Sequence, residues 1–324
     1  MLVCAILASA GFILARQFSF AAGIAVPIVA AFCWQAVLYC AAVSAAARRA
    51  VRAAFGPLTL AALLVAASVA PYWLYSVPTG LFSWASALKL AALCALIAFP
   101  YALWRAPGRR LGWQDAVVIC ALSYPMISGL STLFRDVYQG FEPPAHRLDA
   151  LGKLMLIPIG LYVFLVLRRL DQAGFRLVPT RDDLRTALAC SAHAMPWVAL
   201  VGIVTGYLQW DPPVGRVLAA LAASVSKLVG IYFTTALAEE FLLRGVVQNL
   251  LARSTGKPML GQGVSAVLFG AVHLGRGGFP NLPYAATAAV LGWFCGMAYK
   301  RSRSVTPAML THALAVAGQE LLFL

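Results

Sequence analysis

Residues 231–251 read IYFTTALAEEFLLRGVVQNLL, an apolar stretch with a helical pattern and two adjacent carboxylates, Glu239 and Glu240. An uninterrupted helix of this length can cross a bilayer, because a spanning helix needs roughly 20 largely apolar residues. An ionisable side chain at membrane depth is costly and is therefore a functional candidate by default. The stretch predicts a membrane-spanning helix that carries part of a functional site.

The composition of the whole chain indicates the same class of protein. Of 324 residues, 62% are hydrophobic and 11% are charged, and the mean hydropathy is +0.83. These values lie far outside the range of a soluble domain, so we predict an all-α, polytopic bundle of transmembrane helices. The apolar runs indicate about eleven spans, near residues 1–15, 18–46, 57–78, 81–104, 115–134, 150–167, 187–208, 217–250, 261–274, 282–299 and 305–324.

The basic residues cluster in short segments between the apolar runs. The formal charge of +14 suggests a nucleic-acid partner in a soluble protein, but this placement follows the positive-inside pattern of membrane proteins. The clusters are Arg48, Arg49 and Arg52, then Arg105, Arg109 and Arg110, then Arg168 and Arg169, then Lys300, Arg301 and Arg303. We expect a cytoplasmic N-terminus and no nucleic-acid partner. Compact loops and the absence of a targeting segment favour a bacterial inner (plasma) membrane.

The longest polar interval, RRLDQAGFRLVPTRDDLR at residues 168–185, divides the chain into two helical halves. With the boundary near residue 174, the domains are residues 1–173 and 174–324. The segment Thr180–Asp183 predicts the start of a helix, because its side-chain oxygens can cap free amides of the first turn. The N-terminal half is expected to lack buried acids and histidines, so it is assigned no chemistry and is expected to be an accessory membrane domain of unknown role.

The eleven acidic residues differ in their sequence surroundings. Eight, among them Asp115, lie in loops or at helix ends, where ionisation costs little, and only Glu239, Glu240 and Glu320 fall within strongly apolar sequence. Arg244 follows Glu240 by four residues in the favourable acid-before-base order and is expected to neutralise it. Glu239 is rotated by about 100° around the helix and remains available to handle a proton. The alternative is a structural Glu-Arg pair with Glu239 at a polar helix seam.

Two of the four histidines, His273 and His312, lie in the last three apolar segments. Phe269 precedes His273 by four residues, so the two side chains share a helix face. A single histidine in an apolar helix is typically a packing residue, but helix bundles build sites from facing helices, and Glu239 adds a third group. Such a set can activate water beside a carbonyl, with the carboxylate as general base and the imidazoles orienting water or stabilising an oxyanion.

Three motifs follow one another in the C-terminal half, namely Glu239-Glu240-x-x-x-Arg244, Phe269-x-x-x-His273, and His312 in the last helix. In this order they resemble the CPBP family, the CAAX-prenyl-endopeptidase and bacteriocin-processing membrane proteins also called Abi proteins. The resemblance covers roughly residues 175–324. It implies a glutamic-type intramembrane endopeptidase without a cofactor, in which Glu239 activates water and the two histidines assist. The implied partner is a membrane-embedded or lipidated polypeptide substrate, cleaved near its C-terminus.

One position departs from the family pattern. The family usually has Asn or Asp four residues after its last histidine, and this chain has Val316 there. A side-chain donor for the oxyanion is therefore missing at that position. Gln319, seven residues after His312 and on nearly the same helix face, is a candidate substitute, or is simply a polar residue near the chain end.

Two other functions stay open. Glu239, His273 and His312 are a plausible set of zinc ligands for a metal-dependent membrane protease, although no HExxH motif pairs the histidines. The third possibility is a transporter, receptor or scaffold in which the buried carboxylate carries protons or fixes packing. Val316 slightly favours this last function, whereas the duplication expected of many transporters is not visible.

Overall fold

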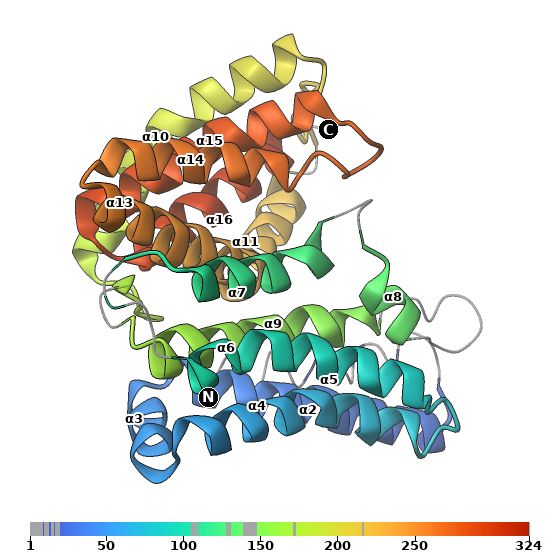
Figure 1. The fold of residues 1–324 in the computed structure, drawn as a ribbon. Helices are drawn as coiled ribbons and strands as arrows, with labels where there is room; N and C mark the ends of the chain where they lie inside the picture. The colour runs from blue at the N-terminus through green and yellow to red at the C-terminus, as the bar shows by residue number, and fades with distance from the viewer. Residues whose placement is uncertain are drawn as a thin grey trace. The chain divides into compact units, whose positions relative to one another are not determined.

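The computed structural model describes residues 9, 13, 16, 20–104, 108, 110–127, 131–138, 148–170, 173–215 and 217–323. Across these residues the chain forms α-helices with short 3₁₀ and π-helical stretches and no β-strand (Figure 1). The predicted all-α fold is therefore confirmed. The predicted first span, residues 1–15, falls mostly outside the described residues.

Within the described part of the chain, five helical segments are long and apolar enough to cross a bilayer. They are Ala22–Val43, Pro57–Ser76, Asp149–Leu167, Arg181–Val204 and Val217–Thr255, and two shorter apolar helices are Trp84–Ala98 and Pro258–Ala271. These helices support an integral membrane protein. The count of about eleven spans and the cytoplasmic N-terminus remain predictions.

The chain divides into two compact units. Unit 1 comprises Met1–Pro107, Gly112–Met126 and Leu130–Leu170, and unit 2 comprises Gly108–Leu111, Ile127–Gly129 and Asp171–Leu324. In unit 1, α4 packs against α2 and α5, and α9 packs against α2. Its helices are α2 (Ala22–Val43), α3 (Ala45–Ala54), α4 (Pro57–Ser76), α5 (Trp84–Ala98), α6 (Pro100–Leu103), α7 (Trp113–Ser123), η1 (Tyr124–Met126), α8 (Leu133–Val137), α9 (Asp149–Tyr162) and the π-helical η2 (Val163–Leu167).

A buried ion pair links α7 to the end of η2 within unit 1. Arg168 Nε lies 2.8 Å from Asp115 Oδ1, and the two side chains are 2% and 0% exposed. The Tyr101 hydroxyl and the Gly112 amide also donate to the Asp115 carboxylate, which helps to offset the cost of removing both charges from water. Arg168 follows η2 and Asp115 lies in the first turn of α7, as predicted for a segment between helices and a helix end. Both side chains are buried, so the prediction that ionisation costs little at Asp115 was wrong.

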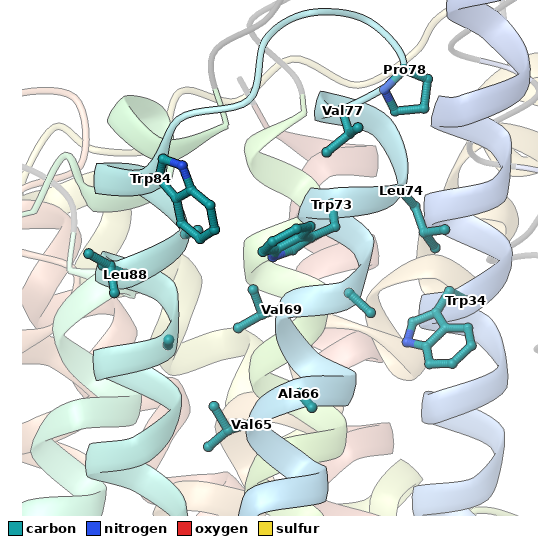
Figure 2. A pocket seen from close by; sticks show the side chains of 13 residues that line it. Trp34, Val65, Ala66, Val69, Trp73, Leu74, Val77, Pro78, Trp84 and Leu88 are labelled. Carbon is teal, nitrogen blue, oxygen red and sulfur yellow. The ribbon is translucent and has the colours of Figure 1, made fainter.

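Unit 1 also contains an apolar groove of about 830 Å³ between α2, α4 and α5 (Figure 2). Three indoles line it, those of Trp34, Trp73 and Trp84. The Trp34 indole N–H donates to the Ala67 carbonyl at 2.9 Å, so the ring has no unmet donor to offer a ligand. The lining residues include no ionisable side chain, so the groove suits hydrocarbon and not acid–base chemistry.

Unit 2 is built around α15, which packs against α10, α14 and α16. The segments α11 and α12 pack against α16. The helices of this unit are α10 (Arg181–Val204), α11 (Val217–Phe233), α12 (Thr235–Glu240), the π-helical η4 (Phe241–Gln248), α13 (Asn249–Thr255), α14 (Pro258–Ala271), α15 (Leu282–Ser302) and α16 (Val305–Leu322).

The first turn of α10 is capped as the sequence predicts. The Thr180 hydroxyl accepts a hydrogen bond from the Asp183 amide, and the Asp183 carboxylate accepts one from the Thr180 amide. This reciprocal arrangement satisfies two amides that have no partner within the helix. Arg176 Nη2 lies 3.0 Å from the Asp183 carboxylate, so the segment before the helix is held to its first turn.

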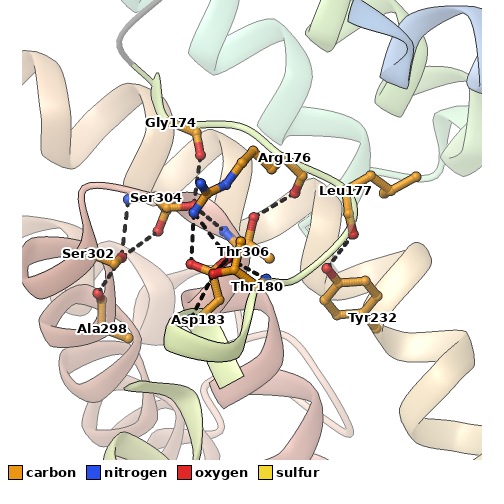
Figure 3. Close-up of polar contacts among 10 residues, drawn as sticks. All are labelled: Gly174, Arg176, Leu177, Thr180, Asp183, Tyr232, Ala298, Ser302, Ser304 and Thr306. Carbon is orange, nitrogen blue, oxygen red and sulfur yellow. Dashed lines mark hydrogen bonds and ion pairs between the residues drawn. The ribbon is translucent and has the colours of Figure 1, made fainter. Parts of the chain in front are cut away.

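The segment before α10 is also fixed to the turn that precedes α16 (Figure 3). The Ser304 hydroxyl donates to the Gly174 carbonyl at 2.9 Å, and the Thr306 hydroxyl donates to the Arg176 carbonyl at 2.6 Å. Gly174 has φ +66°, and a Cβ there would lie 2.0 Å from the Arg303 carbonyl oxygen. Only glycine fits this position, and the close approach fixes the start of α16 within unit 2.

The stretch at residues 231–251 is helical but interrupted, so the prediction of an uninterrupted helix was wrong. α11 ends at Phe233, and Thr234 has φ −120° and ψ −86°, outside the helical region. α12 begins at Thr235 and leads directly into π-helical turns over Phe241–Gln248. Local π-helical geometry is frequent at functional sites, and here it directly follows the two glutamates.

Candidate active site

Three segments of unit 2 supply the ionisable side chains predicted from the sequence. Glu239 and Glu240 are the last residues of α12, His273 follows the C-terminal end of α14, and His312 lies in α16. α12 packs against α16, and η4 packs against α14 and α16. The site is therefore assembled from facing helices of one unit, as in other helix bundles.

Glu240 and Arg244 form a fully buried ion pair. Arg244 Nη1 lies 3.1 Å from the Glu240 carboxylate, and both side chains are 0% exposed, so the pair predicted from the four-residue spacing is present. Arg244 Nη2 also donates to the Gly292 carbonyl in α15 at 2.7 Å. The guanidinium carbon lies 4.9 Å from the centre of the Phe269 ring, within range of a cation–π interaction. These contacts hold both charged groups in one position.

His312 is oriented by Glu240 and not by Glu239. Its Nδ1 lies 2.9 Å from Glu240 Oε1 and 4.0 Å from Glu239 Oε2. Because the carboxylate of Glu240 is paired with Arg244, it acts as an acceptor and His312 Nδ1–H donates. The remaining ring nitrogen, Nε2, is left for a water or a substrate. No spacing of residues indicates this bond, which joins positions 72 apart in the chain.

Glu239 is the less constrained of the two carboxylates. Its side chain is 24% exposed, against 0% for Glu240. Among the described residues no Arg or Lys pairs with it, and its buried Oε2 has no hydrogen-bond partner. Buried polar atoms normally have a partner, so this oxygen is suited to receive a proton or a hydrogen bond from an incoming group.

His273 lies in the turn after α14, with its ring fixed by the main chain. Its Nδ1 lies 2.7 Å from the Phe269 carbonyl, and a carbonyl can only accept, so Nδ1–H donates and Nε2 is left over. The His273 ring centre lies 4.9 Å from that of Phe269 and 5.0 Å from that of Tyr284. Phe269 also lies 5.4 Å from the His312 ring. The rings of Phe269 and His273 lie together, as the four-residue spacing predicts, although His273 lies beyond the end of α14, and the Phe269 ring contacts both imidazoles.

Gln319 connects to this group only through aromatic rings. Its Nε2 lies 3.5 Å from the Tyr207 hydroxyl, at the limit of a hydrogen bond. The Tyr207 ring stacks on that of Tyr284 at 4.7 Å, and Tyr284 in turn contacts His273. The idea that Gln319 replaces the missing oxyanion donor stays a prediction.

Two glycines of α15 leave space for polar side chains of η4. Neither was predicted, because the prediction considered charged residues. Arg244 donates to the Gly292 carbonyl, and Gln248 Nε2 donates to the Gly296 carbonyl at 3.0 Å. A Cβ at Gly292 would lie 3.1 Å from Arg244 Nη2, and one at Gly296 would lie 2.9 Å from Gln248 Oε1. The Gly292-x-x-x-Gly296 spacing is the sequence signal for such a close contact between membrane helices.

The geometry offers no ready ligand set for the zinc alternative. Within the described part of the chain, no three His, Cys, Asp or Glu side chains are grouped so that they could hold one metal ion. Zinc ligands must converge to about 2.0–2.2 Å from one point, and the Nδ1 hydrogen bonds of His273 and His312 leave Nε2 as the nitrogen that could ligate. Metal dependence stays a prediction that chelation can test.

These features define a class: a helical membrane protein whose C-terminal unit holds a carboxylate without an Arg or Lys partner among the described residues, two fixed imidazoles and a buried glutamate–arginine pair. Residues 221–318 match the family model described as Type II CAAX prenyl endopeptidase Rce1-like. The chain therefore carries an Rce1-like domain, consistent with the resemblance to the CPBP family, and Glu239, His273 and His312 all lie inside it. This domain implies CAAX-type membrane protease activity. No curated protein and no solved structure matches the chain.

Proposed function

We propose that the protein hydrolyses a peptide bond in a membrane-anchored or lipidated polypeptide, with Glu239 as the base that activates water. The contrast between the two neighbouring carboxylates carries this proposal. Glu240 is 0% exposed and paired with Arg244, whereas Glu239 is 24% exposed and its Oε2 has no hydrogen-bond partner. The Rce1-like domain supplies the class of reaction.

The reaction needs one proton carrier. Glu239 takes a proton from water while the water oxygen forms a bond to the scissile carbonyl carbon, and the carbonyl π-electrons move to oxygen to give a tetrahedral oxyanion. When the oxyanion collapses, the C–N bond breaks and Glu239 returns the proton to the leaving amine. One water is consumed, and the products are a new carboxyl end and a new amino end.

The two imidazoles assist at their free Nε2 atoms. His312 is held through Nδ1 by Glu240, and His273 is held through Nδ1 by the Phe269 carbonyl. When one ring nitrogen of a histidine is held by a hydrogen bond, that bond sets the orientation of the ring and the role of the other ring nitrogen. Each Nε2 can accept from the attacking water when neutral, or donate to the oxyanion when protonated. A donor from an imidazole matters here because Val316 has no side-chain donor for the oxyanion.

We assign the reaction to the C-terminal domain, residues 174–324, and propose that residues 1–173 form an accessory membrane domain without chemistry of its own. The apolar groove of unit 1 (Figure 2) has no ionisable lining residue, which is consistent with this division. A bacterial inner membrane is the proposed location. The scheme needs no metal or other cofactor.

The test compares the membrane proteome of the host strain with wild type, Glu239→Gln and Glu239→Ala. We expect both variants to accumulate membrane proteins with unprocessed C-termini. The matched control is Glu320→Gln, which makes the same chemical change at a carboxylate that is 40% exposed and paired with Lys227. Thermal unfolding of each purified variant shows whether it folds. Identical peptide termini in wild type and in folded Glu239 variants contradict the proposal.

A further inference from the structure

Arg276, which forms no ion pair with a carboxylate among the described residues, lies beside one histidine of the proposed site. The Arg276 amide donates to the His273 carbonyl at 3.1 Å. Its Nη1 donates to the Tyr284 hydroxyl at 2.8 Å, and its guanidinium carbon lies 5.4 Å from the centre of the Tyr284 ring. Tyr284 packs on the His273 ring and lies close enough to Glu239 for the two groups to interact electrostatically. The arginine therefore belongs to the surroundings of the proposed catalytic groups.

The loop that carries Arg276 is held in one conformation by its own hydrogen bonds. The Asn281 side-chain amide donates to the Arg276 carbonyl at 2.8 Å, and the Asn281 main-chain amide donates to the Leu274 carbonyl at 2.7 Å. The Asn281 side-chain oxygen accepts from the Tyr284 amide at 3.1 Å. The guanidinium is thus positioned in advance, which lowers the entropy cost of binding a ligand.

The guanidinium has free capacity for an anion. It carries five N–H donors, of which one is used by Tyr284, and no carboxylate among the described residues forms an ion pair with it. The Arg276 side chain is exposed, so a ligand can reach it. The planar fork of an arginine matches a carboxylate, to which it can donate two parallel hydrogen bonds.

We propose that Arg276 binds the C-terminal carboxylate of the substrate, an inference that rests on the proposed peptidase function. The centre of the Tyr284 ring lies 5.0 Å from the centre of the His273 ring and 5.4 Å from the Arg276 guanidinium carbon. The guanidinium carbon therefore lies at most about 10 Å, the sum of these distances, from the centre of the His273 ring. An extended peptide spans at most about 3.3–3.6 Å per residue. A leaving peptide of about three residues is therefore long enough to reach Arg276 from a scissile carbonyl beside His273.

This assignment makes Arg276 a specificity-determining residue. The enzyme measures the position of cleavage from the free end of the chain, so a substrate whose C-terminus is amidated loses the charge that Arg276 recognises. The Tyr284 hydroxyl, which accepts from Arg276, retains its own O–H as a further donor toward the bound peptide.

The experiment measures kcat/KM for two peptides that differ in one group. Each peptide contains a prenylated cysteine followed by three residues; one ends in a free carboxylate and the other in a carboxamide. Purified full-length protein is reconstituted in vesicles of phosphatidylcholine, a lipid without net charge. For wild type we expect about a tenfold preference for the free acid, as for the loss of one charge-assisted hydrogen-bond pair. Arg276→Gln is expected to lower this preference to within about twofold.

Arg276→Lys keeps the positive charge but lacks the planar guanidinium, and it is expected to prefer the free acid to an intermediate degree. The test therefore does not depend on the folding of Arg276→Gln. The matched control is Arg185→Gln, which removes an arginine that is 81% exposed at the start of α10 and should keep the full preference. Equal cleavage of acid and amide by wild type, or an unchanged preference in folded Arg276→Gln, overturns the assignment while the peptidase function stands. If wild type cleaves neither peptide, the assignment fails, and the proteome comparison of the Glu239 variants decides separately whether the proposed function stands.

Discussion

Replacing Arg244 with leucine is expected to destabilise the protein by about 3–5 kcal/mol, the cost of leaving one member of a buried ion pair uncompensated. Arg244 and Glu240 are both 0% exposed, and their charged groups lie 3.1 Å apart. Without the guanidinium, the Glu240 carboxylate keeps, among the described residues, only the hydrogen bond from His312. The Gly292 carbonyl also loses the donor that lies 2.7 Å away.

A double variant separates the charge from the volume of the side chain. In Glu240→Gln with Arg244→Leu the buried charge is gone, and the glutamine oxygen can still accept from His312. We expect this variant to recover at least about 2 kcal/mol relative to Arg244→Leu alone, because replacing both members of a buried pair is far less costly than removing one.

The assay is unfolding of purified protein in mixed micelles by titration with sodium dodecyl sulfate, followed by near-ultraviolet circular dichroism. Arg185→Leu serves as the control for loss of an arginine; its pairing with Asp182 at 3.5 Å is exposed, so a change within about 0.5 kcal/mol is expected. A change below about 1 kcal/mol in Arg244→Leu, or a double variant less stable than the single one, would refute the assignment of a buried ion pair.

Three further predictions test the surroundings of the site. Gly174→Ala should lower the free energy of unfolding by about 3 kcal/mol or more, because its Cβ would meet the Arg303 carbonyl oxygen at 2.0 Å. Gly206→Ala has open space and only the strain of φ +74°, so it should lower the free energy of unfolding by about 1–2 kcal/mol in the same assay. Gly292→Ala places a Cβ 3.1 Å from Arg244 Nη2 and should lower kcat, whereas Gly263→Ala, whose nearest neighbour lies 3.9 Å away, should not. Dialysis against a zinc chelator should leave hydrolysis of the prenylated peptide unchanged, and a loss restored by zinc alone would favour the metal-dependent alternative.

Local patterns in the sequence predicted those parts of the structure that depend on short-range geometry. Hydropathy predicted the helical membrane class because a bilayer leaves few ways to satisfy backbone polar groups. The Glu240–Arg244 pair and the shared face of Phe269 and His273 followed from four-residue spacing along a helix. The Thr180 cap followed from the side chains that can bond to free amides at a helix start.

Contacts between distant segments were not predictable in the same way. The burial of Asp115 was not predicted, because the residue that pairs with it, Arg168, is 53 positions away. The break at Thr234 has no proline or glycine to mark it, so the apolar pattern continued through it. The Glu240–His312 bond depends on how α12 packs against α16, and this packing has no signature in the spacing of charged residues.

The adjacent glutamates are the point at which these two kinds of information meet. Neighbouring helix positions differ by about 100° in direction, so a pair of carboxylates in sequence must enter two different environments. One direction leads to Arg244 and the His312 Nδ1, where a carboxylate is fixed as an acceptor and orients the imidazole. The other leads to a partly exposed position without a cation. In the proposed mechanism these two tasks fall to different carboxylates: Glu240 holds His312 in place, and Glu239 exchanges a proton with water.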